Sequence, residues 1–155
     1  MILSKNFTLQ EFTKSVSAIR NNIDNSPNAE HIRNIQLLVK YVLQPLREGL
    51  NKPIRITSGY RSEALNKAIK GSKKSQHCKG QAADLQFKVD GVMNNKMVWD
   101  KVIELGLPFD QMINEFNYSW IHISYNHEYN RKSLLEAYKE SGKTKYKYHT
   151  IEKGL

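Results

Sequence analysis

Residues 111–125 have the sequence QMINEFNYSWIHISY, and this stretch decides how the fold is built. Two short runs rich in β-branched, aromatic and other apolar residues flank the four residues 116–119. Strand-like runs on either side of a short connection are typical of a β-hairpin. The sequence therefore predicts two adjacent antiparallel strands in this part of the chain.

The position of the turn determines which side chains share a face of this hairpin. If Asn117 and Tyr118 form the turn, Glu115 pairs opposite Trp120, and Trp120 lies on the same face as His122. Glu115 and His122 are then diagonal neighbours on one face. The hairpin is therefore expected to hold a carboxylate close to an imidazole.

Strands are also predicted upstream of the hairpin. Residues 54–57 alternate as a short strand, and residues 82–87 form another after the loop at 71–80. In the second strand, alternation places Asp84 on the more open face and Leu85 on the apolar face. The sequence thus predicts a carboxylate on the open face of a strand.

Apolar residues at helical spacing predict helices elsewhere in the chain. Ser26 and Pro27 are expected to start a long helix, which Pro45 kinks or shortens and Gly49 ends. Further helical stretches are predicted over 62–69 and 92–105, and weakly through Leu134, Leu135 and Tyr138, before a basic tail at 139–155.

The size and composition of the chain are those of one folded domain. The 155 residues are expected to form a single domain, 1–155, with a core that needs no disulfide. The single cysteine, Cys78, excludes an intramolecular disulfide. No apolar run is long enough to span a membrane, and the first residues lack the pattern of a signal peptide. We therefore expect synthesis in the cytoplasm.

The chain carries 24 Lys and Arg against 15 Asp and Glu, a formal net charge of +9. This excess favours anionic partners such as nucleic acid, an acidic membrane or the bacterial cell wall, and charge alone does not choose among them. A nucleic-acid function would depend only on the charge and the tyrosines of the tail, so no specific nucleic-acid partner is expected.

Three residues form a candidate metal site: His77, Asp84 and His122. Two imidazoles and one carboxylate are ligands of zinc that leave a fourth tetrahedral position for water, which is the pattern of a catalytic site. Asp84 lies in an otherwise apolar strand, where an unpaired carboxylate is costly, and His122 alternates with buried isoleucines. The alternative for any one histidine is an ordinary surface or capping role.

Three motifs of the sequence resemble the M15 group of zinc peptidases. They are SGYRS at 58–62, SQHCKGQAAD at 75–84 and WIH at 120–122, within a motif core of residues 54–125. This group contains D-alanyl-D-alanine carboxypeptidases and dipeptidases, and phage or bacterial murein endopeptidases. The N-terminal stretch at 12–27 is similar to that of small phage and prophage members.

The resemblance implies a fold and a set of site residues. The fold is α+β, a small antiparallel sheet flanked by helices, of the hedgehog and DD-peptidase type. His77, Asp84 and His122 stand where the family's ligands bind one Zn²⁺ per chain. Arg61 stands where an arginine polarises the scissile carbonyl, and Ser75 where a serine binds the substrate's carboxylate. The structural alternatives are an exposed arginine at a helix start and an N-cap serine.

The sequence departs from the family pattern at one position. Many members carry the catalytic carboxylate three residues before the last zinc-binding histidine, where this chain has Ser119. We expect Glu115 to serve as the general base, because the hairpin places it on the His122 face. Its alternative is a solubilising charge on an edge strand. Asp110 is the reserve candidate, expected mainly to position the turn at Gln111.

The remaining candidates have structural explanations. Trp120 is expected to form the floor of the substrate site or to pack against the core. Cys78 lies next to His77, but adjacent side chains in extended backbone point apart, so no catalytic thiol is expected. His31, His127 and His149 lie outside the matched motifs.

Two functions follow from this sequence. The first is a zinc-dependent hydrolase of peptidoglycan stem peptides, either a D-Ala-D-Ala carboxypeptidase or a murein endopeptidase such as a phage endolysin. The alternative is a catalytically degenerate module of the same fold that binds cell-wall peptide. The protein is expected to be a monomer that acts on the wall after release by lysis or with a holin.

Overall fold

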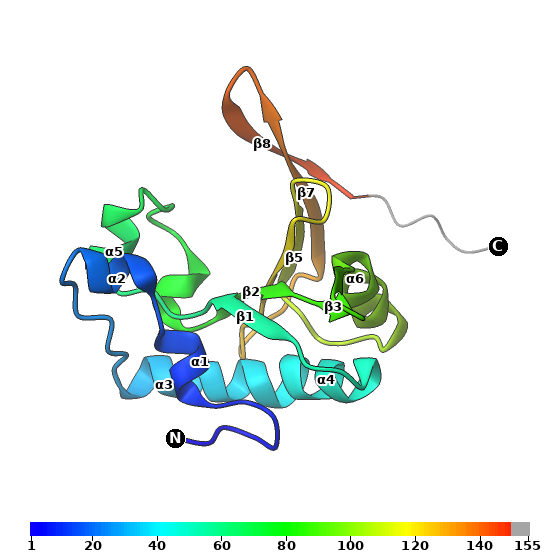
Figure 1. The fold of residues 1–155 in the computed structure, drawn as a ribbon, viewed down its shortest axis with the longest axis horizontal. Coiled ribbons are helices and arrows are strands. Elements are labelled where there is room, and N and C mark those ends of the chain that lie inside the picture. The colour runs from blue at the N-terminus through cyan, green and yellow to red at the C-terminus, as the bar shows by residue number, and fades with distance from the viewer. Residues whose placement is uncertain (150–155) are drawn as a thin grey trace.

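The computed structural model describes residues 1–149, which fold around a six-stranded sheet with the strand order β1-β2-β6-β5-β7-β8 (Figure 1). The strands are β1 Arg55–Ser58, β2 Ala82–Gln86, β5 Gln111–Glu115, β6 Trp120–Ser124, β7 Ser133–Glu140 and β8 Lys143–Tyr148. A separate two-stranded sheet pairs β3 Lys88–Val89 with β4 Val92–Met93. The α+β class expected from the sequence is confirmed.

Within residues 1–149, six α-helices, a π-helical turn and a short 3-10 helix accompany the sheet. They are α1 Leu9–Thr13, α2 Val16–Arg20, α3 Ala29–Leu38, the π-helical η1 Val39–Leu43, α4 Gln44–Leu50, α5 Glu63–Ala68, the 3-10 helix η2 Gln76–Lys79 and α6 Asn95–Glu104. None of these helices is long and apolar enough to cross a membrane.

The β5–β6 hairpin has the predicted register. Glu115 lies opposite Trp120, and Ile113 lies opposite His122. Phe116, Asn117 and Tyr118 in the turn all have positive φ, between 52° and 61°. The Tyr118 N–H donates to Asn114 Oδ1 at 2.6 Å, which holds this uncommon conformation. The hairpin prediction is therefore confirmed.

The C-terminal segment differs from the prediction. Residues 133–148 form the β7–β8 hairpin rather than a helix followed by a tail, and residues 150–155 of the expected tail lie outside the described residues. Ser141 and Gly142 have φ of 52° and 76°, as a two-residue hairpin turn requires. Strand β7 pairs in parallel with β5, so the sheet is mixed and not wholly antiparallel as expected.

The long N-terminal helix starts and ends differently from the prediction. Its N-cap is Asn28, whose Oδ1 accepts the His31 N–H at 2.8 Å, and not Ser26. The π-helical turn η1 precedes Pro45 and leads into α4, so the helix passes the proline and continues to Leu50. It ends at Asn51 in the left-handed conformation, beyond Gly49.

The helix expected over 92–105 also begins later than predicted. Val92 and Met93 belong to β4 and are exposed, and α6 starts at Asn95. The buried Asn95 side chain accepts the Phe87 N–H at 2.8 Å through Oδ1 and donates to the Tyr118 carbonyl. This one amide therefore fixes the start of α6 against the end of β2 and the hairpin turn.

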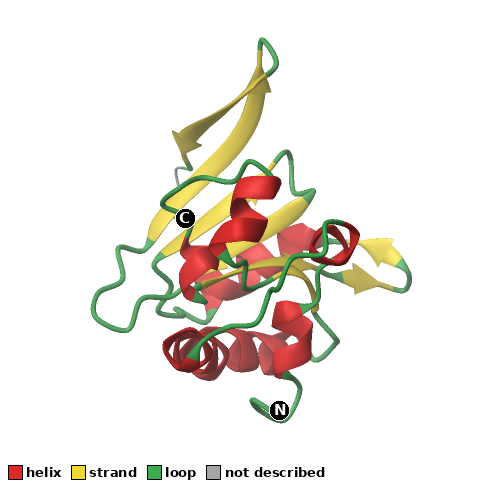
Figure 2. Cartoon of the chain, turned by 90° about the vertical axis from the view of Figure 1, so that its left-hand side faces the viewer, coloured by secondary structure: helices red, strands yellow, loops and turns green. Residues whose placement is uncertain are grey.

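The two faces of the sheet differ in character. Leu85, Ile121, Ile123 and Met112 are fully buried on the face covered by η1, α4 and α6, where they form one hydrophobic core with these helices. Figures 1 and 2 show these helices beside the sheet and the β7–β8 hairpin projecting away from them. The other face carries Asp84, Glu115 and His122, so alternation along each strand separates the core from the candidate site.

Candidate metal centre and active site

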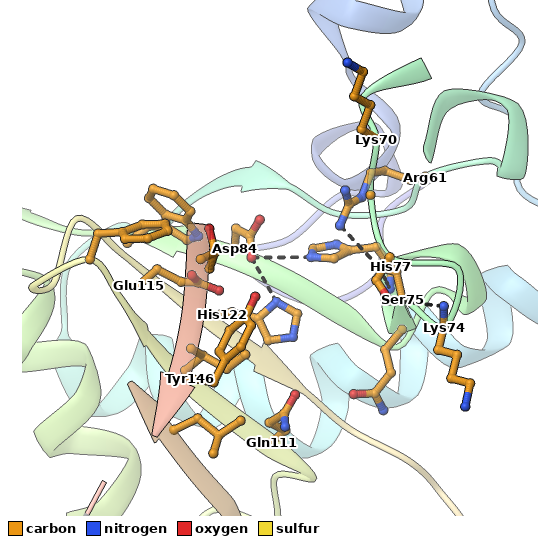
Figure 3. Close-up of a pocket in the computed structure, with 18 of the residues that line it drawn as sticks. Arg61, Lys70, Lys74, Ser75, His77, Asp84, Gln111, Glu115, His122 and Tyr146 are labelled. Carbon is orange, nitrogen blue, oxygen red and sulfur yellow. Dashed lines mark hydrogen bonds and ion pairs between the residues drawn. The ribbon is translucent and has the colours of Figure 1, made fainter. Parts of the chain in front are cut away.

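The three predicted metal ligands meet on the open face of the sheet. Asp84 on β2 lies directly opposite His122 on β6, and its Oδ1 is 3.1 Å from His122 Nδ1. The same Oδ1 is 3.4 Å from Nε2 of His77, which comes from η2 (Figure 3). One potential ligand atom from each residue lies within 4.8 Å of the other two. Residues 45 positions apart in sequence therefore form one cluster.

The orientation of His77 suits metal binding. Its Nδ1 is 2.6 Å from the carbonyl oxygen of Gly59, an interaction in which Nδ1 donates its proton. This tautomer leaves a lone pair on Nε2, which faces Asp84. The His77 ring is buried, and burial lowers its pKa against the opposing effect of Asp84, so the neutral form required of a ligand is favoured.

Asp84 is ionised in this environment. Burial raises the pKa of the carboxyl group, but His77 and His122 outweigh burial and hold the pKa well below its usual range. The donor set is thus two imidazole nitrogens and one carboxylate oxygen, which fits Zn²⁺ in a three-residue site. His77, Asp84 and His122 are the residues that would hold the ion.

Glu115 lies on the same open face as the cluster, as the hairpin register predicts. It is 8% exposed, and no side-chain or backbone group within residues 1–149 donates a hydrogen bond to its carboxylate. Burial raises the pKa of Glu115 to about 7, with the Asp84 charge adding to the rise and His122 opposing it. A carboxyl group with a pKa near neutrality can both accept and return a proton.

Arg61 and Ser75 lie on the other side of the cluster from Glu115 (Figure 3). The Arg61 guanidinium donates to Ser75 Oγ at 3.3 Å, and its Nε is buried without a partner within the described residues. Ser75 is also the N-cap of η2, where its Oγ accepts the His77 N–H at 3.2 Å. Ser75 therefore has the capping role, and both residues line the cleft.

Asp110, the reserve candidate for the base, is held by hydrogen bonds to other residues. It is 3% exposed, and it accepts hydrogen bonds from Gln76 Nε2 at 2.9 Å and from the Arg131 backbone and guanidinium at 2.9–3.0 Å. Burial raises the pKa of Asp110, but these hydrogen bonds outweigh it and lower the pKa overall. Asp110 thus ties the residue next to His77 to the start of β5. No local sequence pattern predicts the pairing of Asp110 with Arg131, which lie 21 positions apart.

A cleft of about 830 Å³ surrounds the cluster. Trp120 lines it, with its ring 5.4 Å from that of Phe116, so this tryptophan belongs to the site rather than to the core. Four further lining residues come from the unpredicted hairpin: Leu135, Lys139, Thr144 and Tyr146. Alternation along two strands places these four side chains on one face of the hairpin. The sequence predicts this shared face only if residues 133–148 are assigned to strands.

The other titratable candidates lie away from the metal centre. Within residues 1–149, neither Cys78 nor a third histidine joins the cluster. Burial raises the pKa of the Cys78 thiol, which disfavours the reactive thiolate. The His31 ring packs 4.9 Å from that of Tyr60, and the His149 ring 4.7 Å from that of Trp99.

The sequence of this chain matches a known protein family. A family model described as Peptidase M15 matches residues 5–124, more than three quarters of the chain. The matched region contains His77, Asp84 and His122 as well as Arg61 and Glu115, and it ends before β7. No curated protein matched the chain. The chain belongs to the peptidase M15 family.

Proposed function

We propose that this peptidase is zinc-dependent and hydrolyses peptidoglycan stem peptides at a bond involving a D-amino acid. Family membership supports peptidase activity. The observation that carries the proposal is the meeting of His77, Asp84 and His122 with Glu115 in one cleft. Carboxypeptidase and endopeptidase action are the two forms that this function can take.

The metal and Glu115 have complementary tasks in such a reaction. His77, Asp84 and His122 would hold the zinc ion, which when bound would supply Lewis acidity to a carbonyl oxygen and lower the pKa of a water molecule. Glu115 accepts the proton of the attacking water and then donates it to the leaving amine. Its lack of a hydrogen-bond donor within the described residues leaves both carboxylate oxygens available for this transfer.

Arg61 is placed to stabilise negative charge on the substrate. Its guanidinium lies across the cluster from Glu115 and has unused donor capacity, including the buried Nε. A fixed cation next to a carbonyl oxygen is worth most where charge develops in the transition state. We assign to Arg61 the stabilisation of the carbonyl oxygen. The Ser75 hydroxyl, which Arg61 contacts, is the group we assign to the substrate's carboxylate.

Ser119 is the observation that favours the second candidate, a binding module without turnover. The residue at this position cannot act as a carboxylate base. In the structure, however, its Oγ donates to the Phe116 carbonyl at 2.7 Å within the hairpin turn. Ser119 thus stabilises the turn, and Glu115 provides the carboxylate from the neighbouring strand. This arrangement favours the enzyme over the binding module.

Digestion of purified peptidoglycan tests this function. Wild-type protein should release new peptide ends whose mass identifies the bond, and a chelator should stop the release until zinc is restored. The Glu115→Gln variant should release almost none, whereas Glu104→Gln, on the exposed end of α6, should match the wild type. Binding of wall peptide by the wild type without any release would support the binding module instead.

A further inference from the structure

We propose that the β7–β8 hairpin forms part of the substrate site, with Tyr146 as a substrate-contacting residue, so that the substrate extends beyond the two residues of the scissile bond. This inference rests on the proposed peptidase function and specifies the length of its substrate. The hairpin lies outside the residues that match the family. The family match therefore does not assign a role to the hairpin.

The sheet register places Tyr146 on the face of the metal centre. Glu115 pairs with Ala137 of β7, and Ala137 pairs with Tyr146 of β8. Directly paired residues in neighbouring strands project to the same face of a sheet. Figure 3 shows the Tyr146 side chain on the cleft side, with Glu115 and His122. Tyr146 thus belongs to the same row of paired residues as Glu115, next to the row that contains His122.

The two faces of the hairpin have different partners. On the face away from the cleft, Lys145 and Lys147 form ion pairs with Glu140 and Glu136, and Lys147 lies over the Tyr138 ring. These contacts pair two lysines and two glutamates of that face with one another. The cleft face carries Leu135, Lys139, Thr144 and Tyr146. Tyr146 remains 55% exposed there, so its ring area is available to a ligand.

The cleft face is also fixed relative to the catalytic residues. Lys139 Nζ donates to Thr144 Oγ1 at 2.7 Å and lies 5.3 Å from the centre of the Phe116 ring. Phe116 follows Glu115 in the chain, so the hairpin and the proposed base are held together. A ligand at the metal centre therefore meets Tyr146 without any rearrangement of the hairpin.

The two sides of the cleft offer different chemistry to a peptide. Arg61, Lys70 and Lys74 line one side of the metal cluster, and Tyr146 lies on the side of Glu115 (Figure 3). Phe116 and Trp120, which follow Glu115 in the chain and pair with it, add two aromatic rings to the lining of the cleft. A volume of about 830 Å³ is at the upper end of the range for small-molecule pockets. A peptide with an acidic portion on one side of the scissile bond and further residues on the other side fits this arrangement.

Binding of the stem pentapeptide separates this role from catalysis. In a Glu115→Gln background, which keeps the peptide intact, Tyr146→Ala should raise the Kd for the pentapeptide about tenfold. Tyr146→Phe keeps the ring and should stay within about threefold of the parent. Tyr138→Ala removes a tyrosine from the opposite face of the same hairpin and should leave the Kd unchanged. An unchanged Kd in Tyr146→Ala, or an equal loss in Tyr138→Ala, would overturn the inference.

Kinetics of the zinc-loaded enzyme provide the second arm of the test. Wild type should prefer the pentapeptide over the shortest stem fragment that still contains the cleaved bond, and Tyr146→Ala should lose this preference through KM with zinc content unchanged. Active wild type without a length preference overturns the hairpin's role and leaves the proposed function standing. A wild type that neither binds nor cleaves stem peptide overturns both.

Discussion

Asp84 and His122 face each other across two antiparallel strands, with 3.1 Å between Asp84 Oδ1 and His122 Nδ1. Two of the three candidate ligands are therefore placed by a backbone ladder in the middle of the sheet. The third, His77, is held from outside the sheet through the Gly59 carbonyl. Ligands on strands are positioned more accurately than ligands on loops. The geometry of the candidate metal centre is thus preformed by the fold.

The first prediction concerns metal content. Purified wild-type protein should carry about one zinc per chain, and His77→Ala or His122→Ala should abolish binding, because two protein ligands are too few for a stable site. His127→Ala, which changes a histidine outside the cluster, should retain zinc. Elemental analysis of the purified proteins measures this directly. An active wild type without zinc would refute the assignment.

The second prediction concerns the general base. Glu115→Gln keeps the size and polarity of the side chain but removes the proton acceptor, so the rate should fall by about 10² to 10⁴ while zinc stays bound. Ser119→Ala and Asp110→Asn should cost far less activity, because neither side chain lines the cleft. Steady-state rates at confirmed zinc occupancy test this. Near-wild-type turnover by Glu115→Gln would refute the assignment of Glu115 as the base, and full activity of Asp110→Asn as well would show that Arg61 and the metal suffice.

The third prediction concerns stability in acid. The folded-state pKa of Asp110 lies below its unfolded value, so its contribution to stability is complete above about pH 4 and is lost as the pH falls through the folded pKa. At pH 7, Asp110→Asn should lower the free energy of unfolding by about 1–3 kcal/mol. The difference in free energy of unfolding between Asp110→Asn and the wild type should become smaller at pH 2–3, as the wild-type carboxyl group becomes protonated. Urea denaturation at the two pH values measures this difference.

A surface aspartate provides the control for this measurement. Asp100 pairs with Lys96 on α6, but both side chains are more than half exposed. Asp100→Asn should therefore change stability by less than about 0.5 kcal/mol at either pH. Equal effects of the two substitutions would contradict a buried structural role for Asp110.

The fourth prediction concerns Gly59, whose carbonyl orients His77. A Cβ at this position would lie 2.7 Å from the backbone of Phe12, so Gly59→Ala must displace α1 or the strand end. Stability should fall by about 1–3 kcal/mol, and zinc affinity by about 10- to 100-fold. Gly91→Ala, where φ is +79° but no atom lies within 4 Å, should lower stability and leave zinc affinity unchanged. Metal titration against a competing chelator distinguishes the two.

Local sequence patterns predicted the centre of this fold better than its C-terminal part. The β5–β6 hairpin and the pairing of Glu115 with Trp120 depend on neighbouring residues, so alternation and turn length were sufficient. The β7–β8 hairpin was missed because Leu134, Leu135 and Tyr138 also fit a helical spacing. Ser141 and Gly142 favour a two-residue hairpin turn, and this local signal competes with the helical spacing around it.

Contacts between distant segments could not be predicted in the same way. The parallel pairing of β5 with β7 and the binding of Asp110 by Arg131 depend on how a loop returns to the sheet. A single sequence contains no periodicity that specifies such a return. The position of Tyr146 in the cleft, two strands away from Glu115, could therefore not be predicted from the sequence.

The division of the sheet into a core face and a cleft face affects how this protein can change. In β5, for example, Gln111 and Ile113 line the cleft, and Met112 between them belongs to the core. Point substitutions on the cleft face can alter substrate choice without disturbing the packing that stabilises the chain. A one-residue insertion or deletion inside a strand would instead exchange the two faces and lose folding and activity together. Evolution and protein engineering can therefore revise this enzyme by substitution within the strands and by changes of length only in its turns.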